Sequence, residues 1–541
     1  MADSTSSTQG PESSGVAEAG RGLFVRQSTG LVRELSRWDT MVLLLACVLF
    51  PMGYTQAMAF APMFWPHANM FYAFLISIPL ELCFALVYVY FVVLMPRSGG
   101  DYVWVSRIFD PGLGFVANVS ITFIYLTWIS LGFTWMMPIY LNSLAYVAGI
   151  HNSWFVHPSN IVIFIFSSIT TWAIAGLMIL GTKWVARYVI VLFCILWSGI
   201  VLWMILMAVG SHSGMVARFS AHSGTTVNAV SAAAHHLGFS PAGAIAIGST
   251  LVAMIYCSQA FTGFQFAGYW SGEIKNVRKS GTWAILVAFT FSAIAFLVAT
   301  ALIYHYYGFQ FFGNLIYMGL GGGASHWTQS WFPYLPALAN FLPGPHWMAV
   351  FIAISFTMAA FWWPPAGYLA ATRNMFAWSF DRLAPEALTE VNDRTHTPVV
   401  ATVIIAAVLE LLVYLGIYQG LGNFLLNIIV VACAVFAVVS VAAMFTPWIR
   451  PKLHEAGPRW AAARFLGLPV ITYVGAVSAV YFVFICYEAF HTGFGGTLEA
   501  KSLIEALAVP IAATIYYIVI RLYRNRQVEG FSHVFEEIPP E

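Results

Sequence analysis

The sequence predicts an all-α polytopic membrane protein with twelve helices and very little soluble mass. Of its 541 residues, 60% are hydrophobic and only 8% are charged, whereas about a quarter of the residues in an ordinary soluble protein are charged. Apolar stretches recur along the chain and reach the roughly 20 residues that a helix needs to cross a bilayer. Lysine and arginine fall almost entirely in every second loop, as in other proteins with several membrane spans.

Each predicted span is an apolar stretch between polar loops. The twelve spans lie near residues 41–62, 70–95, 113–148, 159–180, 185–209, 242–270, 281–306, 346–379, 398–418, 422–446, 467–488 and 502–522. The third and eighth are longer than a bilayer requires, so they must tilt or continue beyond the lipid. Residues 313–340 contain a glycine cluster, Gly319–Gly323, and are predicted to form a re-entrant or surface-lying segment.

The positive charges predict the orientation in the membrane. If the N-terminus is cytoplasmic, all of the 23 lysines and arginines except Arg218 and Lys501 lie in the cytoplasm. A wrong number of spans would mix the two sides, so this partition supports the count as well. We therefore expect a multi-pass protein of the cell membrane with a cytoplasmic tail over residues 1–37, a membrane domain over 38–525 and a second cytoplasmic tail over 526–541.

Several classes of protein are disfavoured. The net charge of +1 gives no reason to expect a nucleic-acid partner. The six cysteines fall inside apolar spans without CxxC or Cys/His spacing, so neither a zinc site nor a disulfide framework is predicted. No nucleotide-binding or nucleophile motif occurs. We expect no enzyme activity, no cofactor and no bound metal.

The sixth span is predicted to be interrupted in its middle, at Thr262-Gly263-Phe264. Glycine between aromatic residues loosens a helix because it has the highest backbone entropy. Unwound backbone inside a bilayer is tolerated only where it is buried in protein or lines a cavity, and helix ends there present partial charges to a substrate. The alternative is a kink that only helps to pack Phe261 and Phe264.

The first span is predicted to contain a matching break at Phe50-Pro51-Met52-Gly53-Tyr54. Proline removes a backbone donor, and glycine relaxes the turn that follows. Interrupted spans at matching positions of two halves are the best sequence indication of a transporter site. We therefore expect two internal repeats over about residues 38–210 and 242–446, followed by two further helices over about 467–522.

Three motifs identify a resemblance. Pro96-Arg-Ser-Gly-Gly-Asp-Tyr102 follows the second span, Gly272-Glu-Ile-Lys-Asn276 follows the sixth, and Thr372-Arg-Asn374 through Asp381-Arg-Leu-Ala-Pro385 ends the eighth. Over about residues 35–525 the chain resembles the amino acid–polyamine–organocation (APC) superfamily of permeases. The resemblance implies a LeuT-like fold of two inverted five-helix repeats plus two helices. It also implies secondary active transport of an amino acid or related small amine by alternating access.

The resemblance also implies a substrate site at the two breaks. The family's Gly-x-Gly motif falls on Pro51, Met52 and Gly53, and Pro51 has no amide hydrogen to donate to a carboxylate. The expected site residues are Met52, Gly53 and Tyr54 in the first span and Phe261, Thr262, Gly263 and Phe264 in the sixth. The carbonyl groups of the second set are expected to receive the substrate amine, with an aromatic side chain as a gate. Gln265 occupies a position where many members have an acidic residue.

A proton is the expected coupling ion. The position of the coupling lysine of some relatives falls near Leu196, and the eighth-span segment where sodium-coupled relatives carry hydroxyl groups reads Phe-Trp-Trp-Pro-Pro over 361–365. Carboxyl groups inside a membrane are costly and are therefore candidates for function. Glu81 in the second span is the first candidate for a proton relay, with a structural hydrogen-bonded glutamate as the alternative, and Glu410 in the ninth span is second.

Charged residues at the cytoplasmic ends of the second, third, sixth and eighth spans could form an inner gate that breaks when the cavity opens inward. The alternative is a set of surface ion pairs worth about 0–1 kcal/mol each. The candidates for this gate are Arg97, Asp101, Arg107, Glu273, Lys275, Arg373 and Asp381.

Other functions remain as alternatives to a proton-coupled permease: an amino acid exchanger, or a nutrient sensor that kept the fold without transport. A channel is disfavoured because the chain has paired helix breaks and no ring of charges. The predicted pocket is apolar and lacks a charged side chain, which favours a neutral or aromatic amino acid. The histidines, most of which are predicted to be external, are either pH sensors or neutral polar residues. The expected partners are the substrate, a proton and the bilayer.

Overall fold

The computed structural model describes residues 33–48, 50, 52–241, 246–419, 422–494, 498–527 and 535. The predictions for Pro51 and for most of both tails lie outside these residues. Within them, twelve helical segments are long and apolar enough to cross a membrane, which confirms the predicted number. They are Arg37–Phe64, Met70–Leu94, Pro111–Ala148, Asn160–Ile179, Thr182–Val209, Ile247–Tyr269, Val277–Tyr306, His346–Phe380, Val399–Tyr418, Ile428–Ile449, Val470–His491 and Ala500–Arg526.

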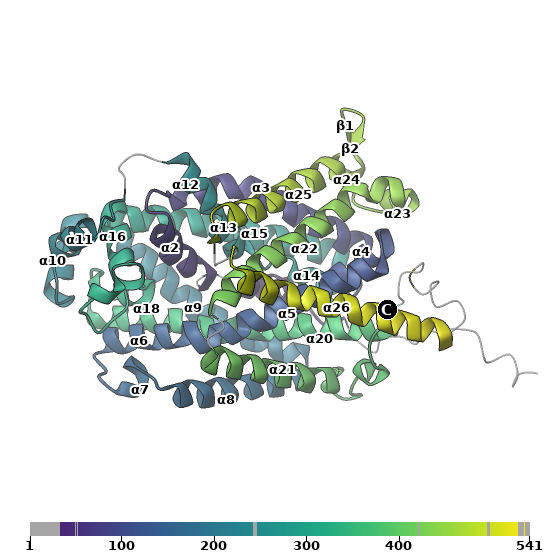
Figure 1. The fold of residues 1–541 in the computed structure, drawn as a ribbon, viewed down its shortest axis with the longest axis horizontal. Coiled ribbons are helices and arrows are strands. Elements are labelled where there is room, and N and C mark those ends of the chain that lie inside the picture. The colour runs from purple at the N-terminus through teal and green to yellow at the C-terminus, as the bar shows by residue number, and fades with distance from the viewer. Residues whose placement is uncertain are drawn as a thin grey trace, which may run out of the picture.

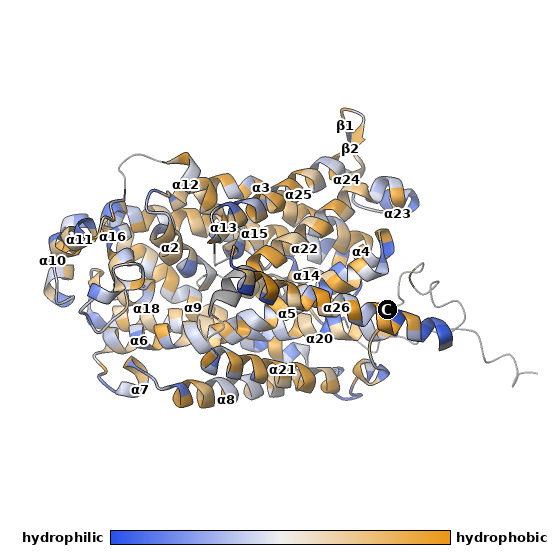
Figure 2. Ribbon diagram, in the orientation of Figure 1, coloured by the Kyte–Doolittle hydropathy of each residue, from blue (hydrophilic) through white to orange (hydrophobic). Residues whose placement is uncertain are grey.

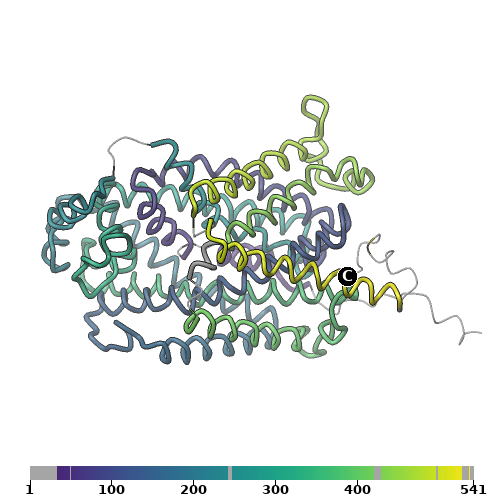
Figure 3. The backbone as a smooth tube through the Cα atoms, in the orientation of Figure 1, coloured from purple at the N-terminus to yellow at the C-terminus, as the bar shows by residue number. Residues whose placement is uncertain are grey.

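Eight spans are single helices that run roughly along the length of the bundle (Figure 1, Figure 3). Among them, α22 and α25 lie side by side. The eight helices are α3 (Met70–Leu94), α8 (Asn160–Ile179), α9 (Thr182–Val209), α15 (Val277–Tyr306), α21 (Val399–Tyr418), α22 (Gly422–Ile449), α25 (Val470–His491) and α26 (Ala500–Gln527).

The other four spans are interrupted. The first consists of α1 (Arg37–Cys47) and α2 (Met52–Phe64), and the sixth of α12 (Ile247–Val252), α13 (Met254–Phe261) and α14 (Phe266–Tyr269). The third consists of α5 (Pro111–Leu131), the π-helix η1 (Gly132–Met136) and α6 (Met137–Ala148). The eighth consists of α18 (His346–Thr357), α19 (Ala359–Trp362) and α20 (Pro364–Phe380). The interruptions in the third and eighth spans were not predicted.

Polar side chains fix where several helices begin. Ser36 and Asp39 form a reciprocal capping box at the start of α1, with bonds of 3.2 Å and 2.9 Å to each other's backbone amides. Asn69 accepts from the amides of Phe71 and Tyr72 at the start of α3. Asp110 caps α5 just before Pro111, whose missing amide hydrogen costs nothing in a first turn. Short loops therefore turn sharply into long apolar helices.

The bundle has two polar ends, and Figure 2 shows hydrophilic residues gathered toward them. We call one the basic end, because Arg97 follows α3 there and Arg382 follows α20 (right in Figure 1). Its short elements are α4 (Asp101–Ile108), η2 (Ser271–Glu273), η5 (Glu386–Thr389), α23 (Pro451–Glu455), α24 (Arg459–Ala462) and the hairpin of β1 (Arg464–Phe465) and β2 (Leu468–Pro469).

The opposite end carries the longer connections between spans (left in Figure 1). Residues 313–340, which were predicted to form a re-entrant or surface-lying segment, lie there as part of α16 and the turns after it, and the side chains of α16 and α17 are mostly buried. The elements of this end are α7 (Ser153–Val156), α10 (His212–His222), α11 (Val227–His236), α16 (Phe309–Leu320), η3 (Ala324–His326), α17 (Leu335–Leu338) and η4 (Ala339–Phe341).

Candidate functional site

The break in the first span exposes the start of a helix in the middle of the bundle. Helix α1 ends at Cys47 and α2 begins at Met52, so Met52, Gly53 and Tyr54 are the first three residues of α2. The amide groups of a first helical turn have no acceptor within the helix and carry the positive end of its dipole. The three predicted residues are therefore positioned to bind an anionic group through their backbone.

The break in the sixth span lies between Phe261, the last residue of α13, and Phe266, the first residue of α14. Gly263 has φ +156°, a conformation that side chains with a Cβ rarely adopt. Its carbonyl accepts from Phe266, and the carbonyl of Phe264 accepts from Ala267. In the described part of the chain, no backbone amide bonds to the carbonyls of Phe261 and Thr262, so those two acceptors remain available.

The two breaks touch each other. A Cβ atom on Gly263 would lie 2.1 Å from the backbone nitrogen of Val48 and 2.3 Å from the carbonyl carbon of Cys47. Such a close approach of two main chains requires glycine, and it brings the end of α1 against the unwound part of the sixth span. The end of α1 and the unwound part of the sixth span therefore meet in the buried centre of the bundle, where α13 also packs against α2.

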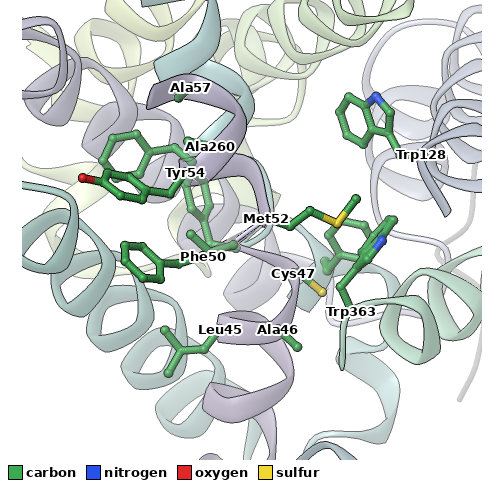
Figure 4. Packing of buried hydrophobic residues seen from close by; sticks show 14 of the residues in the cluster. Leu45, Ala46, Cys47, Phe50, Met52, Tyr54, Ala57, Trp128, Ala260 and Trp363 are labelled. Carbon is green, nitrogen blue, oxygen red and sulfur yellow. The ribbon is translucent and has the colours of Figure 1, made fainter. Parts of the chain in front are cut away.

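One wall beside the breaks is made of large side chains from the third and eighth spans. Met52 extends from the start of α2 toward Trp128 and Trp363 (Figure 4). A Cβ on Gly132, the first residue of η1, would lie 3.2 Å from Met52 Cε and 3.9 Å from Trp363 Nε1. The indole Nε1 of Trp363 is buried and has no hydrogen-bond partner among the described residues. This wall is apolar except for the indole Nε1 groups of Trp128 and Trp363.

The interruptions of the third and eighth spans form this wall. Pro138 follows η1 and cannot donate to the preceding turn, and a π-helix accommodates the unpaired carbonyl groups. Trp363 precedes Pro364 and Pro365, which start α20. In the sequence, these two prolines were considered only because this segment lacks the hydroxyl groups that sodium-coupled relatives carry. The signal that could have located the wall was proline within an apolar span.

The aromatic residues at the breaks pack on the other side, against the second and seventh spans. Phe261 contacts Phe289 and Phe296 of α15, with ring centroids 5.5 Å and 4.9 Å away, and Phe264 contacts Phe84 of α3 at 5.4 Å. Tyr54 donates or accepts a hydrogen bond of 3.0 Å with Thr300. The alternative prediction, that the kink packs its aromatic residues, therefore describes these side chains.

The side chain of Gln265 caps the break. Its Oε1 accepts from the amide of Gly263 at 2.6 Å, and its Nε2 donates to the phenol oxygen of Tyr125 at 3.3 Å. In the sequence, this glutamine was considered only because it is neutral where many family members have an acidic residue. In the structure it holds the amide of Gly263, which shares a peptide bond with the carbonyl of Thr262.

Four of the predicted inner-gate residues form two buried ion pairs at the basic end. Arg107 donates from Nη1 and Nη2 to Asp381, at 2.6 Å and 2.8 Å. Arg373 donates from Nε and Nη2 to Glu273, at 2.6 Å and 3.0 Å. Their side chains are 1–3% exposed, so the alternative of surface ion pairs is wrong for both. The pairs join α4 to the end of α20, and α20 to the end of the sixth span.

The remaining three candidates are arranged differently. Asp101 is fully buried and accepts from two tyrosines rather than from a cation. Lys275 has an exposed side chain and joins the structure through its amide, which donates to Leu35 at 2.9 Å. Arg97 donates to the neighbouring carbonyl of Pro96 at 3.1 Å. Only four of the seven residues therefore form the two buried pairs.

The breaks are also closed on the opposite side. Thr55 of α2 forms hydrogen bonds of 2.9 Å and 3.1 Å with the phenol groups of Tyr140 and Tyr334. Beyond them, Phe60 stacks on Trp135 with ring centroids 5.3 Å apart. Phe60, Trp135 and Tyr334 line a cleft of about 500 Å³ at this end. The centre of the bundle thus lies between two layers of polar contacts.

Glu81 lies in a buried polar cluster beside the sixth span. It is 1% exposed, and its carboxyl group faces Tyr481 of α25 and Ser258 of α13. Its Oε1 has no hydrogen-bond partner among the described residues, and neither do Ser77 Oγ and the phenol oxygen of Tyr481. Ser258 is one turn before the break and its carbonyl accepts from Thr262. The cluster is therefore connected to the unwound segment.

One family of known proteins matches most of the length of this chain. A family profile described as amino acid permease matches residues 65–513. The chain belongs to the amino acid permease family. No individual curated protein gives a significant match. The resemblance drawn from the three motifs is confirmed, and the permease is a multi-pass membrane protein that transports amino acids rather than an enzyme.

Proposed function

We propose that this permease is a proton-coupled secondary active transporter that carries an amino acid across the cell membrane by alternating access, with its basic end and both termini in the cytoplasm. The contact of Gly263 with the backbone at Cys47 and Val48 carries the proposal. It supports a single binding site in which the start of α2 receives the carboxylate and the carbonyls of Phe261 and Thr262 receive the ammonium group.

The wall beside the breaks favours a neutral substrate with a large apolar or aromatic side chain. Met52, Trp128 and Trp363 are uncharged and almost fully buried, and a charged side chain brought among them would lose its hydration without a partner. The free Nε1 of Trp363 offers one hydrogen bond to the cargo.

Two sets of contacts support alternating access. The ion pairs Arg107–Asp381 and Arg373–Glu273 close the basic end, and Thr55 with Tyr140 and Tyr334 closes the other end. Access from one side requires that only the set on that side breaks. Each set includes residues in or next to the interrupted spans, which are the first, third, sixth and eighth.

Glu81 is the proposed carrier of the coupling proton. Its free oxygen and the unpaired groups of Ser77 and Tyr481 can accommodate either protonation state, since each can donate or accept. A buried carboxyl group beside a helix that must rearrange is suited to link protonation to the state of the substrate site.

Flux measurements on purified protein test this function. In proteoliposomes, a labelled neutral or aromatic amino acid should accumulate when the outside is acidified, and a protonophore should abolish the accumulation. Uptake that persists without a pH gradient but requires an amino acid inside would indicate an exchanger. Saturable binding without flux of any labelled amino acid would indicate a sensor, and either result would overturn proton symport.

A further inference from the structure

Asp101 differs from the other buried carboxylates at the basic end. It is 0% exposed and forms no ion pair within the described part of the chain. Its Oδ1 accepts from Tyr88 of α3 at 2.5 Å, and its Oδ2 accepts from Tyr269 of α14 at 2.6 Å. Two phenol groups therefore replace the arginine that each of the neighbouring carboxylates has.

A chain of hydrogen bonds connects Asp101 to the break in the sixth span. The phenol oxygen of Tyr269 is 3.0 Å from that of Tyr125, which receives the Nε2 hydrogen of Gln265 at 3.3 Å. The Oε1 of Gln265 then accepts from the amide of Gly263 at 2.6 Å. All members of this chain are buried.

Ionised Asp101 fixes the direction of every bond in the chain. A carboxylate can only accept, so Tyr269 must donate to it and its oxygen must accept the hydrogen of Tyr125. The oxygen of Tyr125 then accepts from Gln265, and the glutamine oxygen must face the amide of Gly263. A protonated Asp101 has a hydrogen of its own to donate. One of the two phenols then no longer has to donate to it.

We propose that Asp101 is a proton-binding site that controls the basic-end half of the sixth span through Tyr269, Tyr125 and Gln265. This role rests on the proposed function for its orientation, which places Asp101 at the cytoplasmic side. It adds a second proton site to Glu81, on the other half of the interrupted helix. The carbonyl of Thr262, which is proposed to receive the substrate ammonium group, shares a peptide bond with the amide of Gly263, so the substrate acts on the same chain.

The groups around Asp101 determine the sign of its response to pH. They are Tyr88 from α3, Tyr269 from α14 and Tyr125 from α5. Arg373 of α20 is held by Glu273, and α22, which also packs on α4, contains no charged residue. Burial raises the pKa of Asp101 to about 6, although the two phenols oppose the shift.

Opening the basic end would hydrate Asp101 and return its pKa toward the ordinary value of about 3.9. The state with the higher pKa binds the proton more tightly, so acid stabilises the closed basic end and loss of the proton favours its opening. At a neutral cytoplasmic pH, release of the proton from Asp101 therefore promotes the inward-open state.

Cys47 is a native reporter for this opening. It is 1% exposed and lies at the end of α1 beside Gly263. The protein in nanodiscs, without substrate, is treated with a membrane-impermeant methanethiosulfonate. Peptide mapping then measures the fraction of Cys47 that is modified. Dividing this fraction by the fraction modified in denatured protein at the same pH removes the effect of pH on the reactivity of the thiolate itself. Failure of transport therefore cannot be confused with failure of this proposal.

In the wild-type protein, the ratio of Cys47 modification in the folded state to that in the denatured state should rise roughly tenfold between about pH 5 and about pH 7.5. Asp101→Asn should abolish that rise. Tyr88→Phe and Tyr269→Phe form a matched pair, since each removes one donor from the same carboxylate. Both variants should move the midpoint to higher pH, because each removes a donor that favours the carboxylate. Tyr88→Phe should keep the full rise, whereas Tyr269→Phe should make the rise smaller, because Asp101 then acts only through its own hydration and no longer through the chain. A wild-type pH dependence in Asp101→Asn, or the same profile in both tyrosine variants, would overturn the proposal.

Discussion

Arg373 of α20 and Glu273 of η2 form two parallel hydrogen bonds at 2.6 Å and 3.0 Å, with both side chains almost completely buried. Thr182, at the start of α9, donates to the same carboxylate at 2.8 Å. One ion pair thus joins the fifth, sixth and eighth spans at the basic end. Removal of either charge would leave the other buried without an opposite charge.

Glu273→Gln is expected to destabilise the folded permease by about 3–5 kcal/mol, because it leaves the Arg373 charge uncompensated. Thermal unfolding in detergent measures the change. The exposed pair of Lys501 and Glu505, 3.9 Å apart, provides the control, since Glu505→Gln should cost less than about 1 kcal/mol. Equal stability of the two variants would show that burial of the first pair has no energetic effect.

Gly263→Ala is expected to abolish transport and to lower stability. Its Cβ would lie 2.1 Å from a backbone atom at the end of α1, and strain at such a position costs about 1–3 kcal/mol. A methyl group on Gly176, inside α8, would meet no neighbouring atom within 4 Å, so Gly176→Ala should preserve uptake and gain about 0.5–1 kcal/mol. Uptake and unfolding should be measured for both. Normal uptake in Gly263→Ala would mean that the breaks need not touch.

Glu81→Gln is expected to uncouple transport from the proton gradient. The amide keeps the size of the side chain but cannot gain or lose a proton, so accumulation driven by an acidic exterior should fall at least about tenfold. Substrate binding, measured by ligand-induced thermal stabilisation, should remain. Glu410→Gln is the control, because Glu410 accepts from Ser168 between α21 and α8, away from the breaks. Gradient-driven uptake at the wild-type level would remove Glu81 from the mechanism.

Trp363→Phe is expected to weaken substrate binding by about 0.5–1.5 kcal/mol, the usual contribution of one hydrogen bond. The replacement keeps an aromatic ring and removes the free Nε1 beside Met52. Trp203 also has a buried Nε1 without a partner among the described residues, but it packs on Phe356 in α18. Trp203→Phe should therefore leave the apparent KM unchanged. Equal effects of both changes would indicate a role in packing alone.

The sequence predicted the spans well because their signals are local. Long apolar runs and the placement of arginine and lysine determine where a helix crosses the bilayer, and the glycines at 53 and 263 indicate where two of them are interrupted. Charged residues at the basic end could be anticipated as a group, but their pairing, as for Arg107 with Asp381, depends on which of them the fold buries together.

The features that the sequence did not predict depend mostly on contacts between different segments of the chain. The sequence does not reveal that Tyr88 and Tyr269 take the place of a cation at Asp101, because 13 and 168 positions separate each tyrosine from it. Gln265 was interpreted by its lack of charge, while its function in the structure comes from the amide that it caps. The π-helix η1 follows from Pro138, a local signal that was not used.

The short parallel bridge between Leu35 and Ile274 attaches the entry of the first span to the exit of the sixth. Leu35 donates to the carbonyl of Glu273 at 3.0 Å and accepts from Lys275 at 2.9 Å. The ends of these two spans at the basic end are therefore expected to move together when the protein changes shape. A pull on the chain just before Leu35, by a fused domain or a bound partner, would then reach the interrupted part of the sixth span.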